Sequence, residues 1–360
     1  MRWLVMQRFL IDLEGYELTD VEKQLITHPE VLGLVVFTRN FKTIDQIHTL
    51  IKSIRAINRE LVIATDHEGG FIQRFIRCGL RALPSARSMG EVYDLNVKCG
   101  LDFARQNGKV MAFQLIQMGI DVSLAPVLDL HGSSQIIGRL DRAFHSNPDI
   151  VAELAKAFIE GMKSVNMPAI GKHFPGHGLS LADSHLDKTV SSSSFEQLLK
   201  TEIKPYAQLI QENALAGIMP AHITYEKVDA QNSAGYSSIW LKNILRKQLK
   251  FDNIILSDCL SMAGADLGDL FKRASKALEA GCDIVIISNQ ERHLILELLN
   301  RNFKPGDNES LTRIQIFKNK LFRFINEDFN YFDTNYFQPS NTKNTEIYSS
   351  YNSLNKTLKI

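Results

Sequence analysis

The chain has 360 residues, of which 44% are hydrophobic and 22% are charged, a composition typical of a globular protein with enough apolar material for a core. Its 41 basic and 40 acidic side chains nearly balance, for a formal net charge of +1. No global field would draw such a protein onto nucleic acid or an anionic membrane, so we expect neither as a partner. A small neutral or mixed-charge substrate fits this balance better.

The cysteines and the N-terminus indicate where the protein works. The four cysteines are scattered, without a CxxC pair, as is typical of reduced thiols in a cytoplasm. Charged Arg8 and Asp12 interrupt the N-terminus before any sustained apolar segment, so it lacks the apolar core of a signal peptide. No run approaches the roughly 18 apolar residues of a membrane span. We therefore expect a cytoplasmic protein.

Short apolar runs rich in β-forming residues alternate with segments of helical periodicity. This alternation is typical of a (β/α)8 TIM barrel, which closes within about 250 residues before insertions. We predict a single-domain α/β barrel, irregular in places, with a doubly wound open sheet as the alternative. The predicted strands cover residues 4–11, 32–37, 61–64, 122–128, 167–170, 216–220, 254–256 and 284–287, and the clearest helices cover 44–57, 101–118, 150–162, 195–211 and 270–280.

The end of the chain differs in composition. From about residue 326 it is rich in Asn, Ser, Thr, Lys and Tyr, glycine is absent and apolar periodicity is weak. Segments of this kind bury too little apolar surface to offset the entropy of folding. We therefore divide the chain into a barrel domain at 1–325 and a polar, non-barrel tail at 326–360.

The segment at residues 171–185 carries the densest set of titratable groups. It follows an apolar run, breaks at a Pro-Gly pair and continues as a polar loop, where catalytic residues concentrate. Imidazole and carboxylate groups suit zinc, so the segment could hold a metal. Alternatively, a carboxylate orients and charges an imidazole that shuttles a proton near neutral pH, or the loop has no function, which this density disfavours. The residues concerned are Lys172, His173, His177, Asp183 and His185, with Asp183 and His185 as the proton-shuttling pair.

Polar side chains also follow other predicted strands. Residues at the carboxyl ends of barrel strands converge on one mouth, where the active sites of TIM barrels lie. A single such residue could be a turn or cap residue, but five positions together indicate a site. They are Asp66, Asp129, Lys172 with His173, His222 and Asp258.

Seven segments, taken in order, resemble the glycoside hydrolase family 3 β-N-acetylglucosaminidases, most closely the single-domain bacterial enzymes of cell-wall recycling. The resemblance extends from about residue 5 to about residue 290 and leaves the tail out. The segments are ATDHEGG at 64–70, LAPVLDL at 124–130, RAFH at 142–145, KHFPGHG at 172–178, DSH at 183–185, MPAH at 219–222 and SDCLSM at 257–262.

The resemblance implies a TIM-barrel catalytic domain that removes a terminal, non-reducing, β-1,4-linked N-acetylglucosamine with retention of configuration. It implies Asp258 as the nucleophile of a covalent glycosyl-enzyme, His185 as the proton donor to the leaving oxygen, and Asp183 as the group that orients His185. Retaining hydrolysis normally uses a second carboxyl group about 5 Å from the first, so a histidine acid is an exception. An imidazole with an ordinary pKa near 6.5 can give and take a proton at neutral pH.

The resemblance also implies which residues hold the sugar. Charged side chains suit this task because they form charge-assisted hydrogen bonds to hydroxyl and acetamido groups. His177 and His222 are expected to support the site through further hydrogen bonds. The implied natural substrate is N-acetylglucosaminyl-1,6-anhydro-N-acetylmuramic acid, with or without its peptide. The positions that match the family's substrate-binding residues are Asp66, Arg74, Arg142, Lys172 and His173.

Three positions depart from the family's usual pattern. Cys259 stands where relatives often carry a second aspartate, His67 replaces a common glutamine, and Phe71 replaces a common arginine. None of these departures removes an implied catalytic group. We therefore expect activity to be retained, with altered electrostatics and substrate affinity near the site.

Other functions remain as alternatives. A phosphorylase would use the same residues with phosphate in place of water, and a histidine acid avoids carboxylate repulsion of that anion. A metal-dependent barrel hydrolase would bind zinc through the 171–185 segment, although no HExxH-type pattern accompanies it. A non-enzymatic sugar-binding module would make Asp258 and His185 dispensable. We expect a monomer that acts on a small muropeptide or disaccharide, without a metal or cofactor.

Overall fold

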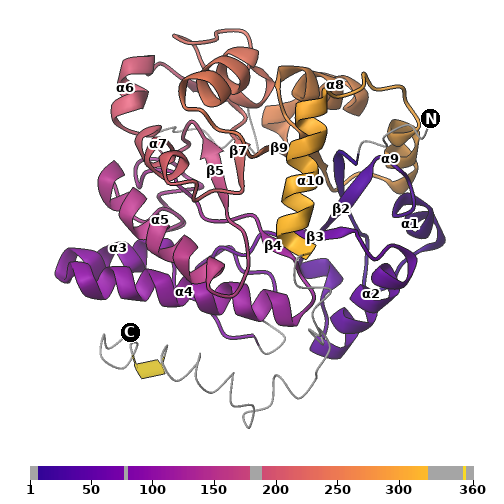
Figure 1. Cartoon of the computed structure of the whole chain (residues 1–360), viewed down its shortest axis with the longest axis horizontal. Coiled ribbons are helices and arrows are strands. Elements are labelled where there is room, and N and C mark those ends of the chain that lie inside the picture. Colours follow the sequence, from indigo (N-terminus) through magenta and orange to yellow (C-terminus); the bar gives the residue numbers. More distant parts are fainter. Residues whose placement is uncertain (1–6, 77–79, 179–188, 323–351, 354–360) are drawn as a thin grey trace.

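The computed structural model describes residues 7–76, 80–178, 189–322 and 352–353. Eight strands form one parallel sheet in the order β4-β3-β2-β1-β10-β9-β7-β5, and helices lie around it (Figure 1). Each strand overlaps one of the apolar runs in the sequence, but the strand at Ile170–Phe174 shares only its first residue with the run predicted at 167–170 and continues through Lys172 and His173. The strands are β1 (Phe9–Asp12), β2 (Val31–Val36), β3 (Val62–Thr65), β4 (Val122–Ser123), β5 (Ile170–Phe174), β7 (Gly217–Pro220), β9 (Ile254–Cys259) and β10 (Ile284–Ile287).

The segment after β4 closes the sheet against β5. Backbone N–H groups of Ile170 and Lys172 donate to the carbonyls of Ala125 (2.8 Å) and Pro126 (3.2 Å), and Leu128 N–H donates to the Lys172 carbonyl (2.7 Å). The regular strand predicted over 122–128 is nevertheless only two residues long. Pro126 has no N–H to donate, so a regular ladder cannot continue through it. The nearly closed parallel barrel confirms the predicted fold, and the open-sheet alternative is wrong.

Local capping sets the bounds of the helices. Helix α2 (Ile44–Ile57) and helix α8 (Leu270–Ala280) span the predicted residues, because Thr43 and Asp269 accept from backbone N–H groups at their starts. The single helix predicted over 195–211 is two helices, α6 (Phe195–Lys200) and α7 (Lys204–Gln211). Pro205 explains the break, because proline suits a helix's first turn and interrupts its interior. The others are α1 (Asp20–Leu25), α3 (Ala86–Leu95), α4 (Val97–Gln117), α5 (Pro148–Lys163), α9 (Arg292–Leu299) and α10 (Asn308–Phe322), with shorter turns η1 (Thr38–Asn40), η3 (Ala234–Tyr236) and η5 (Ala263–Ala265) and the π-helix η4 (Ile239–Gln248).

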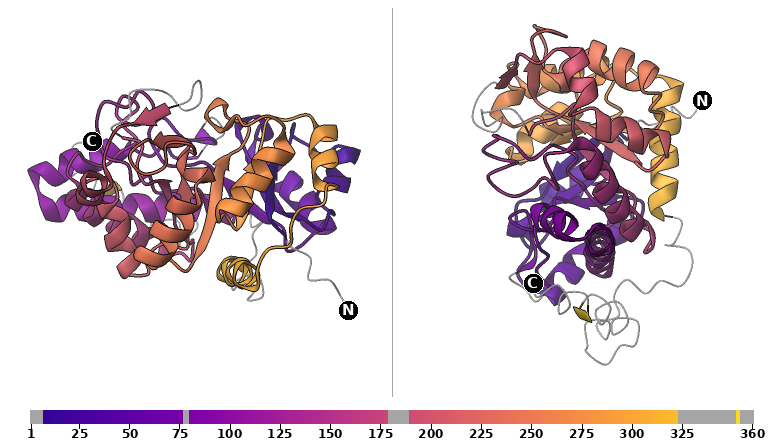
Figure 2. Two further views of the ribbon diagram at one scale, coloured as in Figure 1. Left: turned by 90° about the horizontal axis from the view of Figure 1, so that it is seen from above. Right: turned by 90° about the vertical axis from the view of Figure 1, so that its left-hand side faces the viewer.

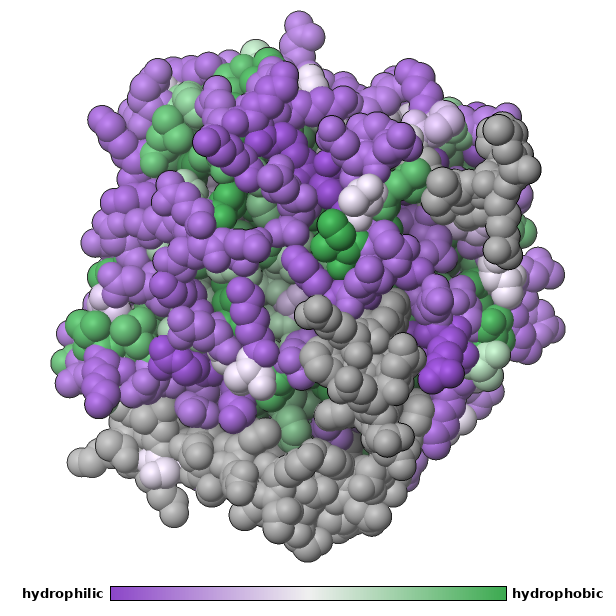
Figure 3. All heavy atoms as spheres, in the orientation of Figure 1, coloured by the Kyte–Doolittle hydropathy of each residue, from purple (hydrophilic) through white to green (hydrophobic). Residues whose placement is uncertain are grey.

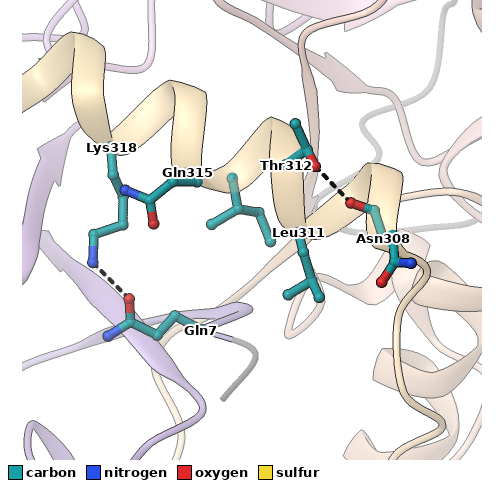
Figure 4. A pocket seen from close by; sticks show the side chains of 7 residues that line it. Gln7, Asn308, Leu311, Thr312, Gln315 and Lys318 are labelled. Atoms are coloured by element: carbon teal, nitrogen blue, oxygen red, sulfur yellow. Dashed lines mark hydrogen bonds between the residues drawn. The ribbon is translucent and has the colours of Figure 1, made fainter. Parts of the chain in front are cut away.

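Helix α10 covers the amino end of the barrel. Ile314, Phe317 and Leu321 are buried in the apolar cluster that fills the barrel interior. The helix runs along one margin of the molecule (Figure 2), and Lys318 Nζ donates to Gln7 Oε1 (2.7 Å), just ahead of β1, beside a pocket of about 340 Å³ (Figure 4). With this end covered, the carboxyl end of the barrel is left for the site.

A second, two-stranded parallel sheet lies beyond the carboxyl end of β7. It pairs β6 (Thr189–Ser191) with β8 (Ile223–Tyr225), and neither strand was predicted. Each has only three residues, too few for an alternating pattern to stand out in the sequence. This sheet places Thr189 beside the segment that carries His222.

The outer face seen in Figure 3 is mainly hydrophilic, with apolar residues scattered among polar ones. Among the described residues, no helix is both long and apolar enough to cross a membrane. The proposed boundary at residue 325 and most of the tail lie outside the described residues, so that division stays a prediction.

Candidate active site

The strand-end residues singled out in the sequence meet at the carboxyl end of the barrel. Lys172 and His173 belong to β5 and Asp258 to β9, while Asp66 directly follows β3. The implied acid/base pair, Asp183 and His185, lies outside the described residues. The geometry below therefore concerns the remaining implied residues and their partners.

One group of four charged side chains, Asp66, Glu68, Arg142 and Lys172, forms what we call the Glu68 cluster. Lys172 Nζ lies 2.9 Å from Asp66 Oδ1 and 2.7 Å from Glu68 Oε1. Arg142 donates to both Glu68 oxygens through Nε and Nη2, each at 2.8 Å. This fork-to-carboxylate arrangement fixes the guanidinium plane. Two of the five implied sugar-binding residues, Arg142 and Lys172, are thus held by a carboxylate that the sequence analysis did not single out, and Lys172 in turn holds Asp66.

The charges of the Glu68 cluster are mutually stabilised. Burial alone would raise the pKa of Glu68, but Arg142 and Lys172 hold that pKa well below its usual range. Burial would lower the pKa of Lys172, but Asp66 and Glu68 keep it above its usual value. Glu68 and Lys172 are therefore both charged at neutral pH, and the charged groups of the cluster suit a polar ligand.

Arg74 lies beside the Glu68 cluster. Its Nη2 is 3.7 Å from Asp66 Oδ2, and the two side chains are 28% and 24% exposed. Both groups therefore remain accessible to a ligand, whereas the Glu68 side chain is only 7% exposed. Arg74 is one of the implied sugar-binding residues, and the structure brings it to the same place as the others.

Asp129 binds the first part of the 171–185 segment, at His173 and His177. Its fully buried carboxylate accepts from His173 Nδ1 (2.7 Å) and from the backbone N–H groups of His173 (3.2 Å) and His177 (2.8 Å). Because a carboxylate accepts only, His173 Nδ1 carries the proton and Nε2 of a neutral ring is an acceptor. Burial lowers the pKa of His177 to about 4, so this ring is neutral at pH 7.

Asp258 lies at the carboxyl end of β9 and is partly exposed. Its Oδ1 accepts from the Cys259 N–H at 2.7 Å. The buried His222 lies next to it, with Nε2 at 3.2 Å from the Cys259 carbonyl, which makes Nε2 the donor. Burial lowers the pKa of His222, against the opposing effect of Asp258, so His222 is a neutral neighbour of a charged carboxylate.

The departures from the family pattern have distinct structural consequences. Burial raises the pKa of Cys259, whose Sγ lies 3.0 Å from Ser288 Oγ, so this position adds no second negative charge beside Asp258. Burial and Arg74 lower the pKa of His67 to about 4, and its Nδ1 accepts from the Arg74 N–H (3.3 Å). Phe71 is 71% exposed, so it replaces a charge with an apolar surface at the rim.

The part of the chain that the structure describes contains no group of three or more His, Cys, Asp or Glu side chains suited to holding a metal ion. Asp183 and His185, which the metal interpretation needs, are outside that part. His173 itself is engaged with Asp129 through Nδ1.

A TIM barrel with an accessible carboxylate and a set of cationic hydrogen-bond donors at one mouth is compatible with a glycoside hydrolase, although the barrel alone does not define that activity. The profile of the Glycosyl hydrolase family 3 N terminal domain matches residues 4–321. The chain belongs to glycosyl hydrolase family 3.

Individual relatives agree with this assignment. The Beta-hexosaminidase of Thioalkalivibrio sulfidiphilus is 46% identical over 310 residues, which cover 85% of this chain and 88% of that protein. The Beta-hexosaminidase of Psychromonas ingrahamii is 42% identical over 326 residues, or 90% of this chain and 95% of that protein. The crystal structure of NagZ from Neisseria gonorrhoeae in complex with N-trifluoroacetyl-D-glucosamine has a TM-score of 0.81 and 37% identity, and the match covers 91% of this chain and 96% of that one. The expected family and enzyme class, a glycoside hydrolase among the β-hexosaminidases, are confirmed.

Replacing Glu68 with glutamine is expected to reduce the free energy of unfolding by about 3–5 kcal/mol, because two buried cations lose their shared carboxylate. The Michaelis constant for a β-N-acetylglucosaminide should rise as Arg142 and Lys172 lose their positions. Urea unfolding and steady-state kinetics measure both effects. The matched control is Glu212→Gln at an exposed ion pair with Lys156, expected to change stability by less than about 1 kcal/mol. Equal effects of the two substitutions would show that Glu68 does not hold the cluster.

Proposed function

We propose that this protein is a retaining exo-β-N-acetylglucosaminidase of peptidoglycan recycling. Its substrate is a terminal, non-reducing β-1,4-linked N-acetylglucosamine on 1,6-anhydro-N-acetylmuramic acid, with or without peptide. The observation that carries the proposal is that a partly exposed Asp258 lies at the same barrel end as the Glu68 cluster and the Asp129–His173 pair. This arrangement supplies a nucleophile next to groups suited to holding a sugar.

In the first step, an Asp258 oxygen attacks the anomeric carbon and the bond to the leaving oxygen breaks. His185 gives its proton to that oxygen, and Asp183 orients His185. In the second step, water gives a proton to His185 and its oxygen attacks the anomeric carbon, which releases Asp258. Two inversions at one carbon produce net retention.

The neighbours of Asp258 support its role as nucleophile. His222 is neutral and the Cys259 thiol is uncharged, so neither places a second charge beside Asp258. The Cys259 N–H donates to Asp258 Oδ1, which restrains the carboxylate. An ionised, oriented carboxylate is the form that attacks an anomeric carbon.

Sugar recognition falls to Asp66, Arg74, Arg142, Lys172 and His173. The accessible oxygens and donors of Asp66 and Arg74 suit pairs of neighbouring hydroxyl groups. The buried members of the Glu68 cluster orient them. A sugar that lacks one of the hydroxyl groups bound here would leave charged groups of the site unpaired. This arrangement therefore discriminates among sugars.

Digestion of N-acetylglucosaminyl-1,6-anhydro-N-acetylmuramic acid, followed by mass spectrometry, tests the proposal. We expect free N-acetylglucosamine and the anhydro sugar, at the same rate with and without inorganic phosphate, and at the same rate in excess chelator. Formation of N-acetylglucosamine 1-phosphate would instead establish a phosphorylase. Loss of activity in chelator that zinc restores would establish the metal-dependent alternative.

A further inference from the structure

Phe37 is an aromatic residue of the barrel mouth for which the sequence analysis found no role. Strands β2 and β3 pair up to their last residues, so Phe37, which follows β2, lies level with Asp66, which follows β3. The centroid of its ring lies 5.6 Å from Cζ of Arg74 and 4.7 Å from Cζ of Arg39. Both distances are within the roughly 6 Å over which an aromatic face attracts a cation. One ring thus contacts two guanidinium groups beside the residues that hold the sugar.

The position of this ring is fixed by the turn that carries it. The Phe37 N–H donates to Oδ1 of the buried Asn40 at 2.9 Å. The Asn40 side chain in turn donates through Nδ2 to the carbonyls of Leu13 (3.0 Å) and Gly15 (2.9 Å). The partly buried ring packs against the apolar cluster that fills the barrel interior. A long side chain that contacts this ring therefore contacts a fixed surface.

Arg39, the nearer of the two cations, is directed into the protein. Its Nη2 donates to the fully buried carboxylate of Asp12, and its Nε donates to the Leu13 carbonyl at 2.9 Å. Asp12 also accepts from Nη2 of Arg292 at 2.8 Å. The charge of Arg39 is thus neutralised by a buried partner, so Arg39 supports the ring from its own side.

Arg74, by contrast, keeps its guanidinium donors available. Its main chain is held separately, because its backbone N–H donates to His67 Nδ1 at 3.3 Å. Its Nη2 lies 3.7 Å from Asp66 Oδ2, which is longer than a hydrogen bond, and its Nε has no hydrogen-bond partner among the described residues. The aromatic face attracts the guanidinium without accepting any of its N–H groups in the plane. The contact with Phe37 therefore orients Arg74 and leaves its donors for a ligand.

We propose that Phe37 is a positioning residue that holds the Arg74 guanidinium in the orientation in which it binds the sugar. This inference rests on the proposed function, because it takes Arg74 to be a sugar-binding residue. An arginine side chain has much rotamer freedom, and a site that has already restricted this freedom binds its ligand more tightly. Phe37 acts only through Arg74 and contacts no reacting atom.

The test removes the aromatic face and keeps the apolar bulk, in Phe37→Leu and Phe37→Met. For an aryl β-N-acetylglucosaminide we expect the KM of both variants to rise about fivefold, the effect of one cation–π contact, with kcat within about twofold of the wild type. Phe37→Tyr, which keeps the ring, should have the wild-type KM. Urea unfolding of each variant checks that the protein is folded.

A double-mutant cycle separates positioning from a general structural role. Arg74→Ala alone should raise KM by about tenfold, and adding Phe37→Leu to it should cause no further rise, because the ring then has no cation to hold. The matched control is Phe303→Leu, which removes a ring of similar burial 5.7 Å from the guanidinium of Arg8, ahead of β1, and should leave KM unchanged.

Two results would overturn the positioning role and leave the proposed function intact. They are a wild-type KM in both Phe37→Leu and Phe37→Met, and a fivefold effect of Phe37→Leu that persists in the Arg74→Ala background. A wild-type KM in Arg74→Ala would be a different failure. It would remove Arg74 from the sugar-binding residues of the proposed function, and the role of Phe37 with it.

Discussion

Asp258→Ala is expected to abolish release of the phenol from an aryl β-N-acetylglucosaminide, with a fall in kcat of at least about 10⁴-fold. The physical reason is that no covalent glycosyl-enzyme can form without the carboxylate at the end of β9. Stopped assays with concentrated enzyme measure the residual rate. Asp252→Ala, an exposed aspartate just before the same strand, is the matched control and should retain wild-type activity.

Added azide makes this experiment more specific. In Asp258→Ala a small anion can enter the face that the carboxylate has vacated and attack the anomeric carbon, while the phenolate departs. The product should be the α-glycosyl azide, which has inverted configuration and is recognised by proton NMR. Undiminished hydrolysis in Asp258→Ala would refute this residue as the nucleophile.

His185→Ala is expected to have the second-largest effect, and the effect should depend on the leaving group. For the natural disaccharide, whose leaving alkoxide needs a proton, we expect kcat/KM to fall by about 10³-fold, within the range for loss of a general acid. For an aryl substrate with an acidic phenol, the same constant should fall by about tenfold or less, because the phenolate leaves with little protonation.

The pH profile gives an independent measurement on the same variant. In the plot of kcat/KM against pH, the limb that reports ionisation of the acid should disappear in His185→Ala. It should persist in His293→Ala, which replaces an exposed histidine paired with Glu291. Equal losses on the disaccharide and the aryl substrate would contradict the acid role. Asp183 would then have to be tested as the acid in its own right.

Much of the barrel could be predicted from the sequence because its cues are local. Each strand of the barrel overlaps a short apolar run, and helices α2 and α8 begin directly after a capping threonine and aspartate. The predictions were wrong where proline changes the backbone, at Pro126 beyond β4 and at Pro205 between α6 and α7. Both residues were visible in the sequence, and their positions could have indicated the breaks.

The site was predictable only in part. Asp66, Lys172 and Asp258 were found because each lies at the end of an apolar run, a position that can be read without a structure. Glu68 lies two residues after Asp66, in a segment already quoted for its resemblance, yet nothing local distinguishes it from an exposed loop carboxylate. The small pocket lined by Thr189, His222 and Lys276 left no motif at all, because its walls come from segments far apart in the chain.

The sequence by itself determined the order of strands and helices, the residue types at the strand ends and the family, because these depend on periodicity and on short motifs. Only the tertiary structure decided which charges pair. Glu68 meets Arg142 across 74 positions of the chain, and Lys172 meets Asp66 across 106. Closure of the barrel brings the strand ends to one mouth, so residues far apart in the chain become neighbours there. Coulomb attraction, which is strong in a buried site, then determines which of these charged groups pair.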